Sequence, residues 1–189
     1  MPSVLDFCSE FEDDHSPLSV RFSLPHAGWV DVEVEPLHES WEINYSEVFD
    51  PMPGLLEWLE KIAAGSPAGT WSIDEEGFYS QLHFVGIPHS PSDPDTYLLH
   101  IQTNCNGLLR IRGVRVERRD LVASFYRGLR TMAEDPTYSP RGWDAHPEFE
   151  RLDDMEEDEY DEAYRAHPFS GTPIHTLRSK SIEDYIADL

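Results

Sequence analysis

Apolar and polar residues alternate along several stretches of this chain, and in two other stretches the apolar residues recur every three or four positions. Alternation is typical of a β-strand with one buried face, while the longer spacing is typical of an amphipathic helix. These changes of period constrain the fold more than any other feature, because they set the order of the elements. The predicted order is three strands, a helix, four strands and a second helix.

The first three strands are predicted by alternation alone. Residues 18–24 and 30–35 each place apolar side chains on one face, and residues 25–28 between them have the composition of a turn. We therefore expect a hairpin. Residues 41–45 alternate in the same way and predict a third strand.

The first helix is predicted by a change to helical spacing. Leu55, Leu59 and Ile62 fall on one helical face, which predicts a helix of about twelve residues. Asp50 can cap its start, and Gly65 is a plausible stop because glycine readily adopts the left-handed conformation that ends helices.

Four further strands and a second helix follow. The strands are expected within 70–73, 78–87, 97–102 and 108–116, with turns at 74–77 and 104–107. Gly113 is a candidate β-bulge in the last of them. Helical spacing resumes near Asp120 and ends before Asp135-Pro136.

Strands joined by short turns pair antiparallel, so the pattern predicts an α+β fold. We expect a mostly antiparallel sheet of six to seven strands with two amphipathic helices on one face. The predicted organisation is an acidic arm at 1–17, the α+β core domain at 18–135, and an acidic, aromatic-containing extension at 136–189. A short terminal helix is expected to begin at Ser181.

The net charge of the chain argues against some classes of binding partner. The 189 residues carry −23, from 37 Asp and Glu against 14 Lys and Arg, which argues against nucleic acid or an anionic membrane as the main partner. We find neither a run of apolar residues long enough to span a bilayer nor a secretory signal, and the two cysteines are expected to be reduced thiols. We therefore expect a cytoplasmic protein. Two lysines beside twelve arginines suit a GC-rich bacterial genome.

The charge is unevenly distributed. Residues 143–165 contain eleven acids and two arginines, a net −9, whereas residues 110–130 contain seven arginines and two acids, a net +5. The acidic segment can either neutralise the arginine-rich region inside the molecule or face a partner.

No catalytic motif fixes a reaction, so we predict no catalytic residue and no cofactor. Glycine-rich phosphate loops and nucleophile elbows are absent, and the histidines and cysteines lack the spacing of a zinc site. We predict no metal site.

The leading functional hypothesis is a small acidic binding protein that engages or neutralises a basic protein partner, as a bacterial immunity-type inhibitor does. Aromatic residues anchor protein interfaces and acids steer basic partners, and one segment of the chain combines both. The predicted partner-binding residues are Trp143, Asp144, Phe149, Asp153, Asp154, Glu156, Glu157, Tyr160 and Tyr164.

Two alternatives from other classes remain open. One is an enzyme or small-molecule binder with a pocket on the open sheet face, using His83, His100, Arg110 and Arg112. The other is self-assembly through a sheet edge or through the apolar stripe of the terminal helix. The sequence leaves the oligomeric state open.

Overall fold

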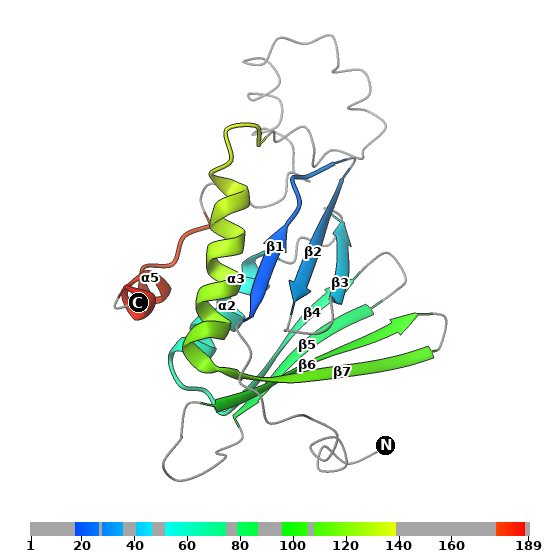
Figure 1. Ribbon diagram of the computed structural model, residues 1–189, viewed down its shortest axis with the longest axis vertical. Coiled ribbons are helices and arrows are strands. Elements are labelled where there is room, and N and C mark those ends of the chain that lie inside the picture. The colour runs from blue at the N-terminus through cyan, green and yellow to red at the C-terminus, as the bar shows by residue number, and fades with distance from the viewer. Residues whose placement is uncertain are drawn as a thin grey trace.

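The computed structural model describes residues 18–26, 28–35, 41–46, 52–74, 79–86, 96–105, 108–138 and 177–187. The predicted α+β class is confirmed, and ten elements make up this part of the chain (Figure 1). In order they are β1 (Ser19–Phe22), β2 (Trp29–Glu35), β3 (Trp41–Ser46), α2 (Met52–Ala63), β4 (Ala68–Asp74), β5 (Tyr79–Gly86), β6 (Thr96–Cys105), β7 (Leu108–Glu117), α3 (Arg118–Ala133) and α5 (Lys180–Ile186).

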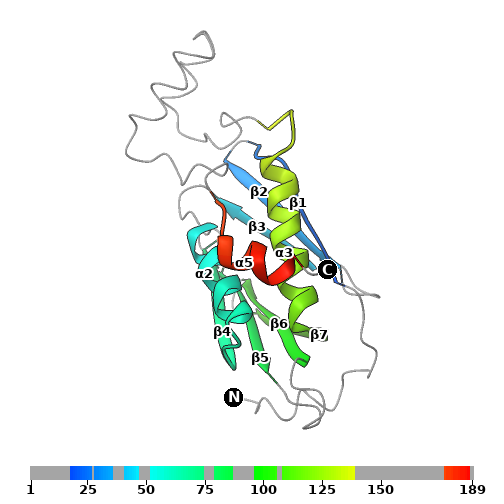
Figure 2. The same ribbon diagram turned by 90° about the vertical axis from the view of Figure 1, so that its left-hand side faces the viewer.

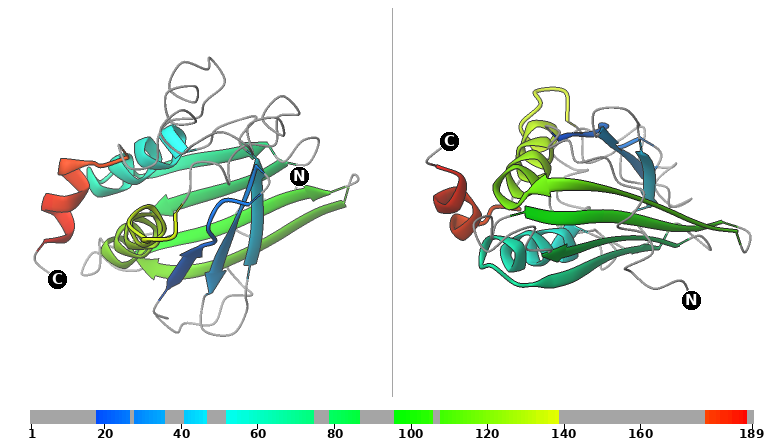
Figure 3. Two further views of the ribbon diagram at one scale, coloured as in Figure 1. Left: turned by 90° about the horizontal axis from the view of Figure 1, so that it is seen from above. Right: turned by 60° about the horizontal axis from the view of Figure 1, so that its bottom comes forward.

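The prediction of a single six-to-seven-strand sheet with two helices is wrong. The described strands form two antiparallel sheets, with the orders β1-β2-β3 and β4-β5-β6-β7, and the described helices include α5 as well as α2 and α3. The sheets separate where α2 interrupts the succession of strands, so that β4 starts a new sheet instead of extending the first. Figure 3 shows the two sheets crossing each other.

The hairpin turns follow the sequence pattern. His26 pairs with Trp29 through two backbone hydrogen bonds of 2.9 and 3.0 Å, and Gly28 takes a φ of 81°. Positive φ is accessible to glycine without steric strain. Cys105 pairs with Leu108, which leaves two residues to connect β6 and β7.

The predicted bulge at Gly113 is wrong. The β6–β7 register runs without interruption, and Gly113 pairs directly with His100. Gly113 is therefore an ordinary strand position. A glycine there weakens the strand but does not shift its register.

The first helix matches its prediction. It has 12 residues and buries Leu55, Leu59 and Ile62. Gly65, at a φ of 82°, ends it by donating its N–H to the Ile62 carbonyl, as expected from its position in the sequence. Asp50, the predicted cap, lies outside the described residues.

The core lies where both sheets meet the helices. Trp58 of α2 is the centre of an aromatic cluster, with ring centroids 6.1 Å from Trp71, 5.9 Å from Phe84 and 5.4 Å from Phe125. Edge-to-face rings at such distances add to the energy of burial. One aromatic cluster thus joins α2, the four-stranded sheet and α3.

The helix α3 covers the outer edge of the three-stranded sheet. Ser124 donates a 2.6 Å hydrogen bond to the Leu18 carbonyl, beside the edge strand β1. A Cβ placed on Gly128 would lie 2.5 Å from the Val20 carbonyl oxygen, so only glycine permits this approach. Figure 1 shows α3 running alongside β1. Among the described helices, none is both long and apolar enough to span a bilayer.

Candidate functional site

The outer face of the three-stranded sheet is strongly acidic. Its strands bury Val30, Val32 and Val34 on the inner face, and alternation sends the intervening side chains to the other side. We call this other side the acidic face. Its charged residues are Arg21, Asp31, Glu33, Glu35 and Glu42.

A single guanidinium partly offsets these carboxylates. Arg21 bonds Glu33 and Glu35 at 2.9 Å each, and these acids raise its pKa. Asp31 accepts a hydrogen bond from the Asn44 amide. Four carboxylates against one guanidinium leave a net −3 on this face.

The acidic face also has a groove and an aromatic residue. An open groove of about 480 Å³ runs over it, lined by residues that include Arg21, Asp31, Glu33 and Glu42. Trp29, half-buried, occupies the same alternation of β2 as Asp31 and Glu33. Acids beside a partly exposed tryptophan are a combination suited to a basic partner with an apolar anchor.

The arginine-rich helix lies on another side of the molecule and is covered by the C-terminal strap, which we define as residues 177–187. Leu177 and Ile182 are buried in the core cluster, and α5 contacts both α2 and α3. Figure 2 shows α5 lying across these two helices. The apolar stripe of the terminal helix, a candidate for self-assembly, packs through Ile182, Tyr185 and Ile186 on its own domain.

The strap helix begins earlier than predicted. Ser179, not Ser181, is its N-cap, and the Ser179 hydroxyl accepts a 3.3 Å hydrogen bond from the Ile182 N–H. The same hydroxyl donates to Glu60 of α2 at 2.6 Å. The cap therefore also fastens the strap to the domain.

Guanidinium groups of α3 bind the strap backbone. Arg119 donates to the Tyr185 carbonyl and Arg130 to the Leu177 carbonyl, both at 3.1 Å. The Arg118 and Arg119 guanidinium carbons also lie 5.6 and 5.9 Å from the Tyr185 ring centroid, within cation–π range. Three arginines of the arginine-rich region are thus engaged by the strap, while the acidic segment that could neutralise this region lies outside the described residues.

The residues of the alternative pocket are divided between two faces of the four-stranded sheet. His83 and His100 pair directly across β5 and β6. Arg110 and Arg112 pair with Thr103 and Ile101, positions that alternate with His100 along β6, so the arginine positions belong to the opposite face. The register brings the two histidines together and does not bring the arginine pair to them.

His83 has a local structural role. Its Nδ1 lies 2.8 Å from the Thr70 hydroxyl on the neighbouring strand, and burial lowers its pKa. It is half-buried and hydrogen-bonded, as a histidine on a polar strand face is expected to be.

The predicted partner-binding segment lies outside the described residues, from Trp143 to Tyr164. Within the part of the chain that the structure describes, no group of three histidine, cysteine or acidic residues is arranged to hold a metal ion.

The acidic face was missed as a candidate site, although its signal is present in the sequence. The stretch from Asp31 to Glu35 places an acid at every second position. Taken as a strand, that pattern puts three carboxylates on one face, opposite three buried valines. The pattern becomes a candidate site only when β1 and β3 pair with β2 on either side and bring further charged residues beside these acids.

No protein-family model matches the chain, and no curated protein matches it in sequence. Among solved structures, it is similar to one described as the plant transcriptional regulator PBF-2. The identity is 13% and the TM-score 0.35, over 79% of this chain and 88% of that one. A likeness at this level assigns neither a fold family nor a function to this chain.

Proposed function

We propose that this protein is an acidic binding protein that engages and neutralises a basic protein partner, in the manner of an immunity-type inhibitor. The observation that carries the proposal is the acidic face, where Asp31, Glu33, Glu35 and Glu42 share one face of the sheet with Arg21 and with a half-buried tryptophan. Charges arranged in this way steer the approach of an oppositely charged partner and favour it over acidic ones.

The separation of charges supports the proposal. Arg119 and Arg130 are engaged with the C-terminal strap, on a different side of the molecule from the acidic face. These two guanidinium groups therefore do not neutralise the acidic face. The segment from Trp143 to Tyr164 is also rich in acids and in aromatic residues.

The test compares two variants with equal net charge. The first neutralises the acidic face with Asp31→Asn, Glu33→Gln and Glu42→Gln. The control neutralises three acids elsewhere, with Glu57→Gln, Glu117→Gln and Asp184→Asn. Each variant is immobilised alongside the unaltered protein and exposed to native lysate at low and high salt, and captured proteins are identified and then purified.

We expect the unaltered protein and the control to retain a basic protein that the acidic-face variant loses. With the purified partner, affinity should fall on the order of ten-fold or more in the acidic-face variant, since exposed ion pairs contribute up to about 1 kcal/mol each. It should also weaken with salt, because about 0.1 M screens charges beyond about 10 Å. Equal loss in both variants, or binding indifferent to salt, would contradict the proposal.

A further inference from the structure

The three-stranded sheet has two edges that differ in what lies beside them. Its first strand, β1, is covered by α3, which donates the Ser124 hydroxyl to the Leu18 carbonyl. Its last strand, β3, lies across the sheet from α3 (Figure 1), and no described strand pairs with its outer side. We call this outer side of β3 the β3 edge. An edge strand of this kind offers unpaired main-chain groups to another chain.

The pairing of the strands shows which main-chain groups lie at the β3 edge. Ser23 donates its N–H to the Asp31 carbonyl at 2.8 Å, so Asp31 directs its main-chain groups toward β1. Asn44 pairs with Asp31, and in an antiparallel sheet the residue opposite then directs its own groups away. Glu42 pairs with Glu33, two positions along, and follows the same rule. The N–H and C=O groups of Asn44 and Glu42 therefore point outward.

These four main-chain groups are open to a ligand. Glu42 and Asn44 are both exposed, and within the described part of the chain no main-chain hydrogen bond crosses the β3 edge from either residue. The hydrogen bonds that hold β3 to β2 come from the residues in between, such as Ile43. An added strand can therefore bond Glu42 and Asn44 without breaking an existing pair.

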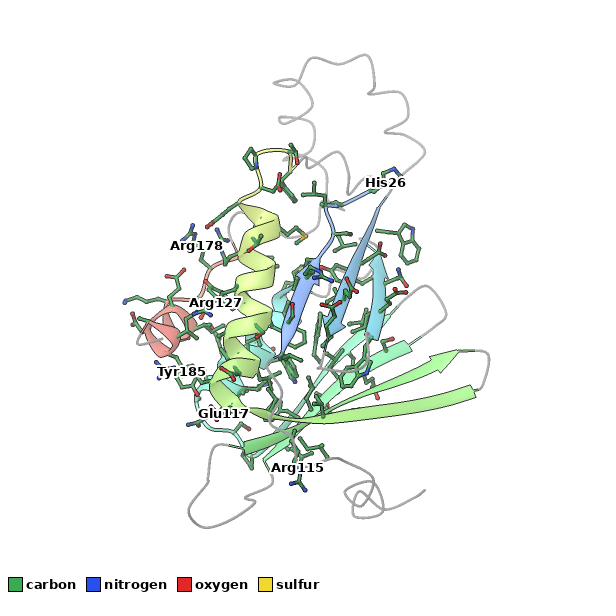
Figure 4. All side chains as sticks on the ribbon, viewed as in Figure 1. His26, Arg115, Glu117, Arg127, Arg178 and Tyr185 are labelled. Carbon is green, nitrogen blue, oxygen red and sulfur yellow. The ribbon has the colours of Figure 1, made fainter. Side chains whose placement is uncertain are left out.

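The charge beside the β3 edge favours one kind of strand. Glu42 lies on the acidic face, and no described cation is paired with it. A second copy of β3 would bring further acid to this face, which opposes pairing, whereas a basic strand would place opposite charges side by side. Figure 4 shows the labelled Arg127 and Arg178 beside α3, across the sheet from the β3 edge.

We infer that the basic partner docks by adding a strand to the β3 edge, so that its main chain pairs with Glu42 and Asn44. Side chains alternate across a strand, so every second residue of the partner's segment lies on the acidic face. Basic residues are expected at these positions, because they lie beside Glu42 and near Asp31. The positive charge of the partner rests on the proposed function, and the mode of docking is added to it. Proteins that bind an extended peptide at a sheet edge gain affinity from the main chain and specificity from alternate side chains.

The experiment measures binding of a fluorescent peptide to the full-length chain by anisotropy at low salt. The peptide alternates arginine and threonine, so that one face of the added strand is basic. The control peptide has the same sequence, with the main-chain nitrogens of its arginines methylated. Methylation removes the donors to the Glu42 and Asn44 carbonyls and leaves the charge unchanged. We expect the control peptide to bind at least about ten-fold more weakly, because main-chain hydrogen bonds are lost.

A substitution at the β3 edge tests the same contact from the other side. Asn44→Pro removes an outward N–H but no hydrogen bond to β2, and an edge strand tolerates proline at such a position. This variant should bind the unmethylated peptide about ten-fold more weakly. Asn44→Thr is the matched control, since it also loses the side-chain bond to Asp31 but keeps the main-chain N–H. It should bind the peptide nearly as well as the unaltered chain.

Hydrogen exchange measures the pairing residue by residue. When the peptide is added, the amides of Glu42 and Asn44 should become protected, because they then donate to the added strand. The Ile43 amide should change little, since it already lies in the ladder with β2. The same pattern is expected with the basic partner that the unaltered protein captures.

Three results would overturn the inference. The first is equal binding of the two peptides, or no binding of either while a basic partner is still captured; the proposed function then stands without strand addition. The second is a captured partner that protects neither the Glu42 nor the Asn44 amide. The third is a stable dimer of the unaltered chain in light scattering that disappears in Asn44→Pro, which would make a second copy the occupant. If Asn44→Pro does not fold, the two peptides decide the outcome on the unaltered chain.

Discussion

Charged residues play different parts in the contact between the C-terminal strap and α3 and on the acidic face. Where the strap meets α3, guanidinium groups are partly buried and bound to carbonyls, and the Arg130 side chain is only 12% exposed. On the acidic face, Arg21 is 60% exposed and its partners Glu33 and Glu35 are 35% and 38% exposed. Charged residues therefore stabilise the fold where the strap meets α3, whereas on the acidic face they lie at the surface. This difference can be tested by substitution, beginning with the largest effect.

Removing the strap's main anchor should have the largest effect. Ile182→Ala is expected to weaken strap docking by about 2–5 kcal/mol, the usual range for such truncations at fully buried sites. Hydrogen exchange of the strap amides should accelerate more than that of β5 amides. Lys180→Ala is the control, since the Lys180 side chain is 84% exposed. Unchanged exchange in the strap would mean that the arginines alone hold it.

A substitution on the other side of α3 tests the support beneath the acidic face. Gly128→Ala would place a Cβ 2.5 Å from the Val20 carbonyl oxygen, and a backbone atom can yield only by moving β1. We expect a loss of about 1–3 kcal/mol in the free energy of unfolding, measured in urea.

Gly54→Ala is the matched control in α2, where the nearest atom to a new Cβ is Trp71 Cδ1 at an ordinary 3.5 Å. Alanine favours a helix over glycine by up to about 1 kcal/mol, so this substitution should stabilise the protein. If Gly128→Ala stabilised the protein as Gly54→Ala does, the result would contradict the close approach of α3 to β1.

Removing the hydrogen bonds between Tyr126 and the strap should have a smaller effect. Tyr126→Phe removes the hydrogen bonds to Glu183 and to the Ser179 N–H, and we expect a loss of about 1–3 kcal/mol. A double-mutant cycle with Glu183→Gln isolates the side-chain bond. Additive effects of the two substitutions would show that Tyr126 and Glu183 are not coupled.

The sequence pattern predicted the elements better than their assembly. The spacing of Leu55, Leu59 and Ile62 predicted α2, and Gly65 its end, because helix spacing and C-terminal glycines are local signals. Which strands pair is not local. The alternation of β3 and β4 is compatible with one sheet or with two, and only the backbone pairing in the folded chain distinguishes the two arrangements.

The candidate sites show the same limit. Alternating acids at Asp31, Glu33 and Glu35 were visible in the sequence, but their importance depends on Arg21 and Glu42, which only strand pairing brings beside them. The docking of the strap joins Tyr126 to Ser179 across 53 positions. No sequence period reports a contact between residues that far apart.

A third surface, the polar face of the four-stranded sheet, should respond to pH. Burial lowers the pKa of His83 in the folded state, so the unfolded chain binds more protons near the ordinary histidine pKa of about 6.5. Stability is therefore expected to fall as pH drops below about 6.5. His83→Gln should flatten this part of the urea-midpoint profile. A steeper profile in His83→Gln would mean that protonated His83 is favoured in the fold.

The smallest effect on stability is expected on the acidic face. Arg21→Ala removes exposed ion pairs with Glu33 and Glu35, and exposed pairs contribute little to folding. Its thermal midpoint should stay close to that of the unaltered protein, whereas Arg130→Ala should lower it clearly, because a partly buried carbonyl of the strap then loses its donor. Added salt should stabilise Arg21→Ala more than the unaltered protein, since screening relieves repulsion among carboxylates left without their cation. A fall as large as that of Arg130→Ala would mean that the acidic face is built into the fold, and its carboxylates would then be less available to a partner.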